Sequence, residues 1–107
     1  MPDYAEVYTA MSDSYARLSQ SDHVAYAQGM EAFCRHEYDL ARMLLEKAAP
    51  GLPLFTPVHV GLGLVYEQLG DLSNAQQSLQ QAIQLDPDNY LASHALGRVQ
   101  RAQGQNS

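Results

Sequence analysis

The sequence has little positive charge, a single cysteine and no tryptophan. Twelve acidic residues stand against six lysines and arginines, which gives a formal net charge of -6 at pH 7. Residues 48–97 contain no lysine or arginine at all. Because the phosphate backbone of a nucleic acid is repelled by such a surface, nucleic-acid binding is not an expected function.

Long hydrophobic runs are also missing. No apolar stretch approaches the roughly 18 residues that a membrane-spanning helix requires, and the acidic N-terminal segment has no uninterrupted apolar region of the secretory type. Cys34 cannot form an internal disulfide, so the chain suits a reducing compartment. We therefore expect a single domain of 107 residues in the cytoplasm, without membrane insertion.

The residues that usually carry catalysis or bind metals are scattered along the chain. The four histidines are not at metal-ligand spacing, and Cys34 has no cysteine neighbour: His23, His36, His59 and His94. The glycines at 61, 63 and 70 do not form a phosphate loop, because no lysine follows them. We expect no catalytic residues, no metal site, no cofactor and no enzymatic activity.

A 34-residue internal repeat organises what is present. Shifting the sequence by 34 places Gly63 on Gly29 in one direction and on Gly97 in the other. The same shift pairs small and apolar residues: Ala41 with Ala75, Leu45 with Leu79, Ala48 with Ala82, and Pro53 with Pro87. A glycine inside a helix costs about 1 kcal/mol relative to alanine. We therefore predict that Gly63 marks a close helix–helix approach, facing Ala75 and Ala82.

Each copy of the repeat is predicted to be two helices. In residues 56–89, Thr56 is a good N-cap and Pro57 a good first helical residue. The first helix should run to about Leu69, with Gly70 as a left-handed stop. Asp71 should cap a second helix that runs to about Leu85, and Asp88 can start the next one. Helices joined by such short turns pack antiparallel.

The sequence of residues 56–89 resembles the tetratricopeptide repeat, as found in small bacterial proteins of that family. Eight residues carry the resemblance: Leu62, Gly63, Tyr66, Gly70, Ala75, Leu79, Ala82 and Pro87. In residues 22–55 the pattern departs at two positions, with His36 in place of the turn glycine and Ala32 in place of the tyrosine. The resemblance implies an all-α fold of about six helices, in which antiparallel hairpins stack as a short right-handed superhelix. It divides the chain into an N-terminal capping helix (1–20), two full repeats (22–55 and 56–89) and a half-repeat capping helix (90–103).

The N-terminal segment has a seam rich in tyrosine at helical spacing: Tyr4, Tyr8, Met11, Tyr15 and Leu18. One interpretation is a cap that packs on residues 22–35. The other is a surface that meets another chain or folds across the protein's own groove, since a tyrosine ring can be buried while its hydroxyl stays solvated. The second interpretation predicts self-association through Tyr4, Tyr8, Met11 and Tyr15, as a homodimer.

The resemblance also implies a binding surface, because the first helix of each repeat in this family lines a concave groove for a peptide. The equivalent positions in this sequence are Tyr26, Met30 and Phe33 in the first copy, Val60, Leu64 and Gln68 in the second, and His94, Arg98 and Arg101 in the third. Two alternatives stay open. The first three residues can be core beneath the N-terminal helix, and the two arginines can be the solvated face of a capping helix.

The mostly apolar character of these positions favours a hydrophobic peptide or an amphipathic helix as the ligand. Arg98 and Arg101 would then pair with an acidic residue of that ligand. Family members that bind the C-terminal carboxylate of chaperones use lysines and asparagines where this chain has Tyr26, Met30 and Leu64, which argues against that ligand. The leading hypothesis is a non-catalytic protein-interaction module, an adaptor or assembly chaperone. The alternative is a structural subunit that forms a homodimer.

Overall fold

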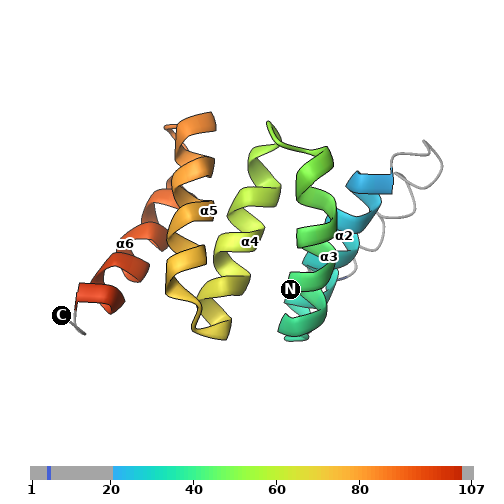
Figure 1. The fold of residues 1–107 in the computed structure, drawn as a ribbon, viewed down its shortest axis with the longest axis horizontal. Coiled ribbons are helices and arrows are strands. Elements are labelled where there is room, and N and C mark those ends of the chain that lie inside the picture. The colour runs from blue at the N-terminus through green and yellow to red at the C-terminus, as the bar shows by residue number, and fades with distance from the viewer. Residues whose placement is uncertain (1–4, 6–20, 105–107) are drawn as a thin grey trace. The chain divides into compact units, whose positions relative to one another are not determined.

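The computed structural model describes residue 5 and residues 21–104, and within this part of the chain the regular structure is entirely helical. The predicted all-α class is confirmed there. The elements are α2 (Ser21–Cys34), α3 (Tyr38–Ala48), a short 3-10 helix η1 (Ala49–Gly51), α4 (Thr56–Leu69), α5 (Leu72–Leu85) and α6 (Tyr90–Gly104) (Figure 1). The chain divides into two compact units, Met1–Pro53 and Leu54–Ser107. The predicted capping helix over residues 1–20 lies outside the described residues.

The first unit is built on the hairpin of α2 and α3, which pack against each other. The contact face of α3 is formed by three residues that are fully buried: Ala41, Leu45 and Ala48. They follow the spacing of one helix face, so burying them holds α3 along the length of α2. Burying a leucine side chain of this kind contributes about 1.5–3 kcal/mol.

The second unit contains the hairpin of α4 and α5 together with α6. Helix α5 packs against both α4 and α6, and α4 also contacts α6 (Figure 1). The fully buried residues of α5 are the equivalents of those in α3: Ala75, Leu79 and Ala82. Helix α6 buries Ala92, Ala95 and Val99 and leaves the other side to solvent, as expected of a helix with one packed face.

The close approach predicted at Gly63 is present, and its nearest partner is Leu79. A Cβ atom at Gly63 would lie 2.5 Å from Cδ2 of Leu79, and all three nearest atoms belong to Leu79. The predicted set lacked this residue: Leu79 lies between Ala75 and Ala82 on the buried face of α5 and makes the nearest contact with Gly63. In the first unit a Cβ at Gly29 would lie 2.8 Å from Cγ of Leu45, which is the equivalent contact.

The turns between the helices confirm the predicted stop at Gly70. Gly70 has a φ of 79°, in the left-handed region, and the Asp71 N–H donates to the Tyr66 carbonyl at 2.9 Å. Asp71 caps α5, since its side chain accepts from the Asn74 N–H at 3.3 Å. In the first unit His36 takes the left-handed position with a φ of 64°.

Two predicted helix starts are wrong by one residue. Helix α4 begins at Thr56, so its N-cap is Phe55 and not Thr56. The missing N–H of Pro57 is tolerated anywhere in the first turn, where backbone N–H groups have no helical partner, so the proline did not fix the boundary. Helix α6 is capped by Asn89, whose Oδ1 accepts from the Ala92 N–H at 2.9 Å, in place of Asp88.

Candidate protein-interaction surface

On α2 two of the three predicted groove residues are buried. Tyr26 and Met30 are 6% and 7% exposed, while Phe33 is half-buried. The Phe33 ring packs against Tyr38 at a centroid distance of 5.7 Å, at the start of α3. Solvent therefore reaches this set chiefly through Phe33, with Tyr26 and Met30 beneath the surface.

On α4 the three predicted residues differ in accessibility. Val60 is 6% exposed, Leu64 is half-buried and Gln68 is exposed. Leu64 lies seven residues after the exposed Pro57, so the two side chains share one side of the helix. The accessible apolar surface of α4 on this side therefore consists of Pro57 and Leu64, and Val60 belongs to the core.

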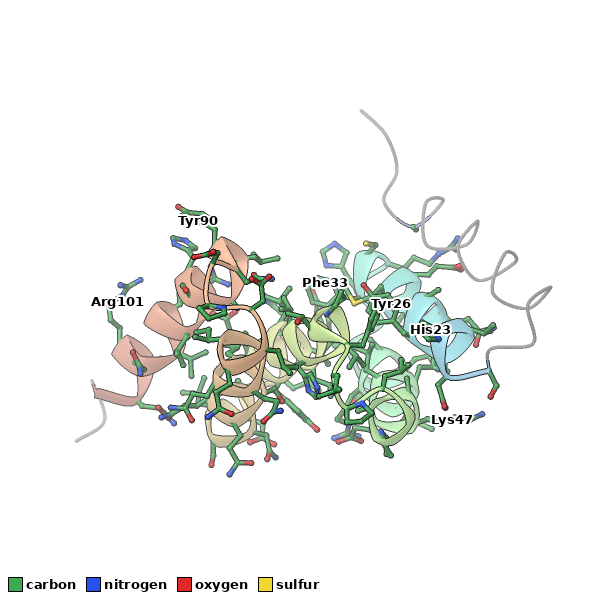
Figure 2. All side chains as sticks on the ribbon, turned by 90° about the horizontal axis from the view of Figure 1, so that it is seen from above. His23, Tyr26, Phe33, Lys47, Tyr90 and Arg101 are labelled. Atoms are coloured by element: carbon green, nitrogen blue, oxygen red, sulfur yellow. The ribbon has the colours of Figure 1, made fainter. Side chains whose placement is uncertain are left out.

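On α6 the three predicted residues have three different environments. His94 is exposed and its ring stacks on Tyr90, with centroids 5.7 Å apart and planes inclined by 13°. Arg98 is half-buried and bound within the unit, while Arg101 is exposed. Figure 2 shows Tyr90 and Arg101 projecting from α6 away from the rest of the unit.

Arg98 makes a two-pronged ion pair with Glu67 of α4. Its Nε donates to Glu67 Oε2 and its Nη2 to Glu67 Oε1, both at 2.9 Å. These hydrogen bonds are the main reason that the pKa of Arg98 is raised above its ordinary value, and partial desolvation opposes them. Bidentate geometry of this kind fixes both side chains and stabilises the contact between α4 and α6.

The predicted set contained Gln68 and lacked its neighbour Glu67. Glu67 lies 34 residues after Phe33 and 34 residues before Arg101, so the repeat itself indicated Glu67 as the equivalent position. Tyr90 and Leu91 were also absent from the predicted set, and they are 79% and 49% exposed at the start of α6. Leu91 is the repeat equivalent of Pro57 and so occupies the same side of its helix.

Within the described residues, no group of three or more histidine, cysteine, aspartate or glutamate side chains is placed to hold a metal ion. The helices of residues 21–104 include none that is long and apolar enough to cross a membrane. The predicted self-association residues Tyr4, Tyr8, Met11 and Tyr15 lie outside the part of the chain that the structure describes, so that homodimer stays a prediction.

Comparison with known proteins agrees with this geometry. Residues 56–89 match the family model of the tetratricopeptide repeat. No curated protein sequence matches the chain. Among solved structures it is similar to the first tetratricopeptide-repeat domain of Spaghetti (RPAP3) bound to the HSP90 peptide SRMEEVD, with 15% identity, a TM-score of 0.76 and coverage of 94% of this chain and 93% of that one.

A second similar structure is the second such domain of human RPAP3 in complex with the HSP70 peptide SGPTIEEVD. The identity is 14% and the TM-score 0.73, and the match covers 91% of this chain and 95% of that one. At this level of identity the likeness establishes the fold. Residues 56–89 are thus a tetratricopeptide repeat, and the chain has the fold of a tetratricopeptide-repeat protein.

Proposed function

We propose that this protein is a non-catalytic adaptor or assembly chaperone that binds an apolar or amphipathic segment of another protein. The binding surface is the accessible side of the first helices, represented in the second unit by Leu64 on α4 and Leu91 on α6. A lone cysteine suits a reducing compartment, so we place this function in the cytoplasm. In the second unit Gln68 and His94 are also accessible and Val60 lies buried. In the first unit, taken by itself, Phe33 is the accessible residue of α2, and Tyr26 and Met30 are buried.

The observation that carries the proposal is the accessibility of Leu64 and Leu91 on equivalent sides of two neighbouring helices. Leu91 is 49% exposed and Leu64 half-buried, although burying either would be favourable. The Glu67–Arg98 pair spans the same two helices and holds them together. An amphipathic helix or an extended apolar peptide is the ligand that covers such a surface.

The charge of the protein surface favours an apolar ligand over acidic peptides of the kind bound in the two similar structures. Residues 54–107 contain only two basic residues, Arg98 and Arg101, against four acidic ones. Arg98 is already paired with Glu67, which leaves Arg101 as the exposed cation of α6. A peptide such as SRMEEVD carries three carboxylate side chains, so this surface would repel it more than attract it.

The test is photo-crosslinking in lysate of the source organism. A photoreactive residue at position 64 or 91 should capture a defined protein segment, and mass spectrometry should map that segment to an apolar or amphipathic sequence. The matched control places the same residue at Gln77, which is exposed on α5 and outside the proposed surface. A segment captured equally well at position 77 would overturn the assignment of the surface.

A variant with Leu91→Glu tests the contribution of the apolar side chain. Leu91 is about half exposed, so the variant should keep its helical circular dichroism while the crosslink at position 64 weakens by about tenfold, equivalent to about 1.4 kcal/mol. Gln80→Glu on α5 supplies the control for added charge. Saturable binding of the peptide SRMEEVD in calorimetry would instead overturn the proposed ligand class.

A further inference from the structure

The outward side of α3 has apolar side chains at positions where α5 has polar ones. Leu40 and Met43 are 43% and 61% exposed, and Leu44 is half-buried. The residues 34 positions later on α5 are Asn74, Gln77 and Ser78. Because α5 occupies the same place in its hairpin with polar residues, the repeat does not require apolar residues here. A contiguous apolar patch that the fold does not need is typical of an interaction surface.

These apolar residues form one stripe along the helix. Residues 40, 43, 44 and 47 follow the spacing i, i+3, i+4 and i+7 of a single helix face. Lys47 continues the stripe at its end, and Figure 2 shows this side chain extending outward from α3. Met43 points about 160° away from the buried Leu45, which packs in the hairpin. Helix α3 is therefore packed against α2 on one side and offers a second apolar side to solvent.

The charges of α3 make the helix complementary to itself in the antiparallel direction. Asp39 lies in the first turn and Lys47 in the last, four residues before and four after Met43. When two copies of α3 pack antiparallel about Met43, each Asp39 faces the partner's Lys47, so the pair forms twice. Parallel packing would instead set like charges against each other. Charge complementarity therefore favours a second copy of α3 in the antiparallel orientation.

Both charged groups are accessible for this contact. The Asp39 side chain is 82% exposed, and Nη2 of Arg42 is 3.8 Å from its Oδ1, which is longer than a hydrogen bond. An exposed pair of this kind contributes little. Lys47 is exposed, and none of the ion pairs within residues 21–104 includes it. Arg42 and Glu46 are placed two residues on either side of Leu44, so they also match in the antiparallel orientation.

We propose that two copies of this protein associate through the apolar stripe of α3, in an antiparallel two-fold contact centred on Met43 and flanked by the pairs of Asp39 with the partner's Lys47. Both copies contribute the same surface, so the contact closes and association stops at a dimer. Each copy buries only three apolar side chains, where a standard interface has about 20–30 residues a side, so we expect a weak dimer with a Kd on the order of 100 μM. The contact uses no residue of the tyrosine seam or of the proposed peptide surface.

The first experiment is analytical ultracentrifugation of the 107-residue protein from about 10 μM to about 1 mM. The average mass should rise with concentration and level off at that of a dimer. Met43→Glu should raise the Kd at least tenfold, because the new carboxylate would be desolvated against apolar side chains. Met43 is 61% exposed, so this variant should keep the circular dichroism of the wild type. Gln77→Glu adds the same charge at the equivalent position of α5 and should dimerise like the wild type.

The second experiment tests the antiparallel pairing by charge reversal. Asp39→Lys and Lys47→Asp should each weaken the dimer by about tenfold, because each sets like charges together twice. An equimolar mixture of the two variants should recover the wild-type association, since every contact between unlike chains is again between opposite charges. Any loss of helix stability from either substitution remains in the mixture, so recovery reports on the interface alone.

Three results would each overturn the proposal. The first is a wild type that stays monomeric at about 1 mM. The second is a dimer whose Kd is unchanged by Met43→Glu, which would place the contact on another surface. The third is a mixture of the charge-reversed variants that associates no more strongly than either variant alone.

Discussion

The two complete hairpins have the same geometry but different local chemistry. In α2–α3 the Glu37 N–H donates to the Ala32 carbonyl, and in α4–α5 the Asp71 N–H donates to the Tyr66 carbonyl, both at 2.9 Å. The second hairpin has glycine in the left-handed position and a capping aspartate, whereas the first has His36 there and no side-chain cap at Glu37. The same turn therefore forms without its preferred residues, and both hairpins share the contact of a buried leucine with a glycine.

The outer faces of the second helices differ as well. Helix α3 exposes Leu40 and Met43, which are 43% and 61% accessible. The equivalent residues of α5 are Asn74 and Gln77. Because all four side chains are exposed, their polarity can differ between the two hairpins without changing the buried face.

The largest test of the comparison is to remove the shared contact. Leu79→Ala and Leu45→Ala should each lower the free energy of unfolding by about 2–5 kcal/mol, since both side chains are fully buried and leave a cavity. Urea denaturation followed by circular dichroism measures this. Gln77→Ala, on the exposed side of α5, should change it by less than about 0.5 kcal/mol. A small effect of either leucine would show that its hairpin is held in another way.

The glycine beneath each leucine gives the next test. Gly63→Ala should destabilise by about 1–3 kcal/mol, because the new Cβ overlaps Leu79. Gly29→Ala should cost less, since Leu45 is farther away. Gly97→Ala should stabilise by up to about 1 kcal/mol through helix propensity, since its Cβ has room. Equal effects at the three positions, measured by the same denaturation, would contradict the assigned contacts.

Substitutions at the helix caps should also affect the stability of the two hairpins differently, by a smaller amount. Asp71→Ala removes a side chain that accepts from the Asn74 N–H, and should cost about 1 kcal/mol. Glu37→Ala removes no such bond and should be close to neutral. Thermal melting of the two variants beside wild type measures the difference. Similar losses from both substitutions would mean that Glu37 also caps its helix in solution.

The smallest expected effect is at the turn of the first hairpin. His36→Gly should raise the free energy of unfolding by less than about 1 kcal/mol, because glycine adopts the left-handed conformation without steric cost. The gain is reduced by loss of the 2.8 Å hydrogen bond between His36 Nδ1 and Tyr38. His36→Ala is the control, and it should destabilise because it loses the bond and keeps the strain. A destabilised glycine variant in urea titration would place the larger contribution in the hydrogen bond.

The sequence by itself determined the period of the repeat, the helical class and most helix ends. Those features depend on residues close together in the chain: Gly70 stops α4 through its own φ, and Asp71 caps α5 through a bond three residues away. The errors at Thr56 and Asp88 were of one residue. Pro57 is compatible with more than one position in the first turn of α4, and Asn89 is as good a capping residue as its neighbour Asp88.

Only the tertiary structure decided which side chains meet. It placed Leu79 over Gly63, buried Tyr26 and Met30, and joined Arg98 to Glu67 across 31 residues. These outcomes depend on how far each helix is rotated about its axis when it packs, and a rotation of one residue, about 100°, exchanges a buried side chain for an exposed one. The repeat predicts which face of each helix is buried, and the packing of the helices determines which residue on that face makes each contact.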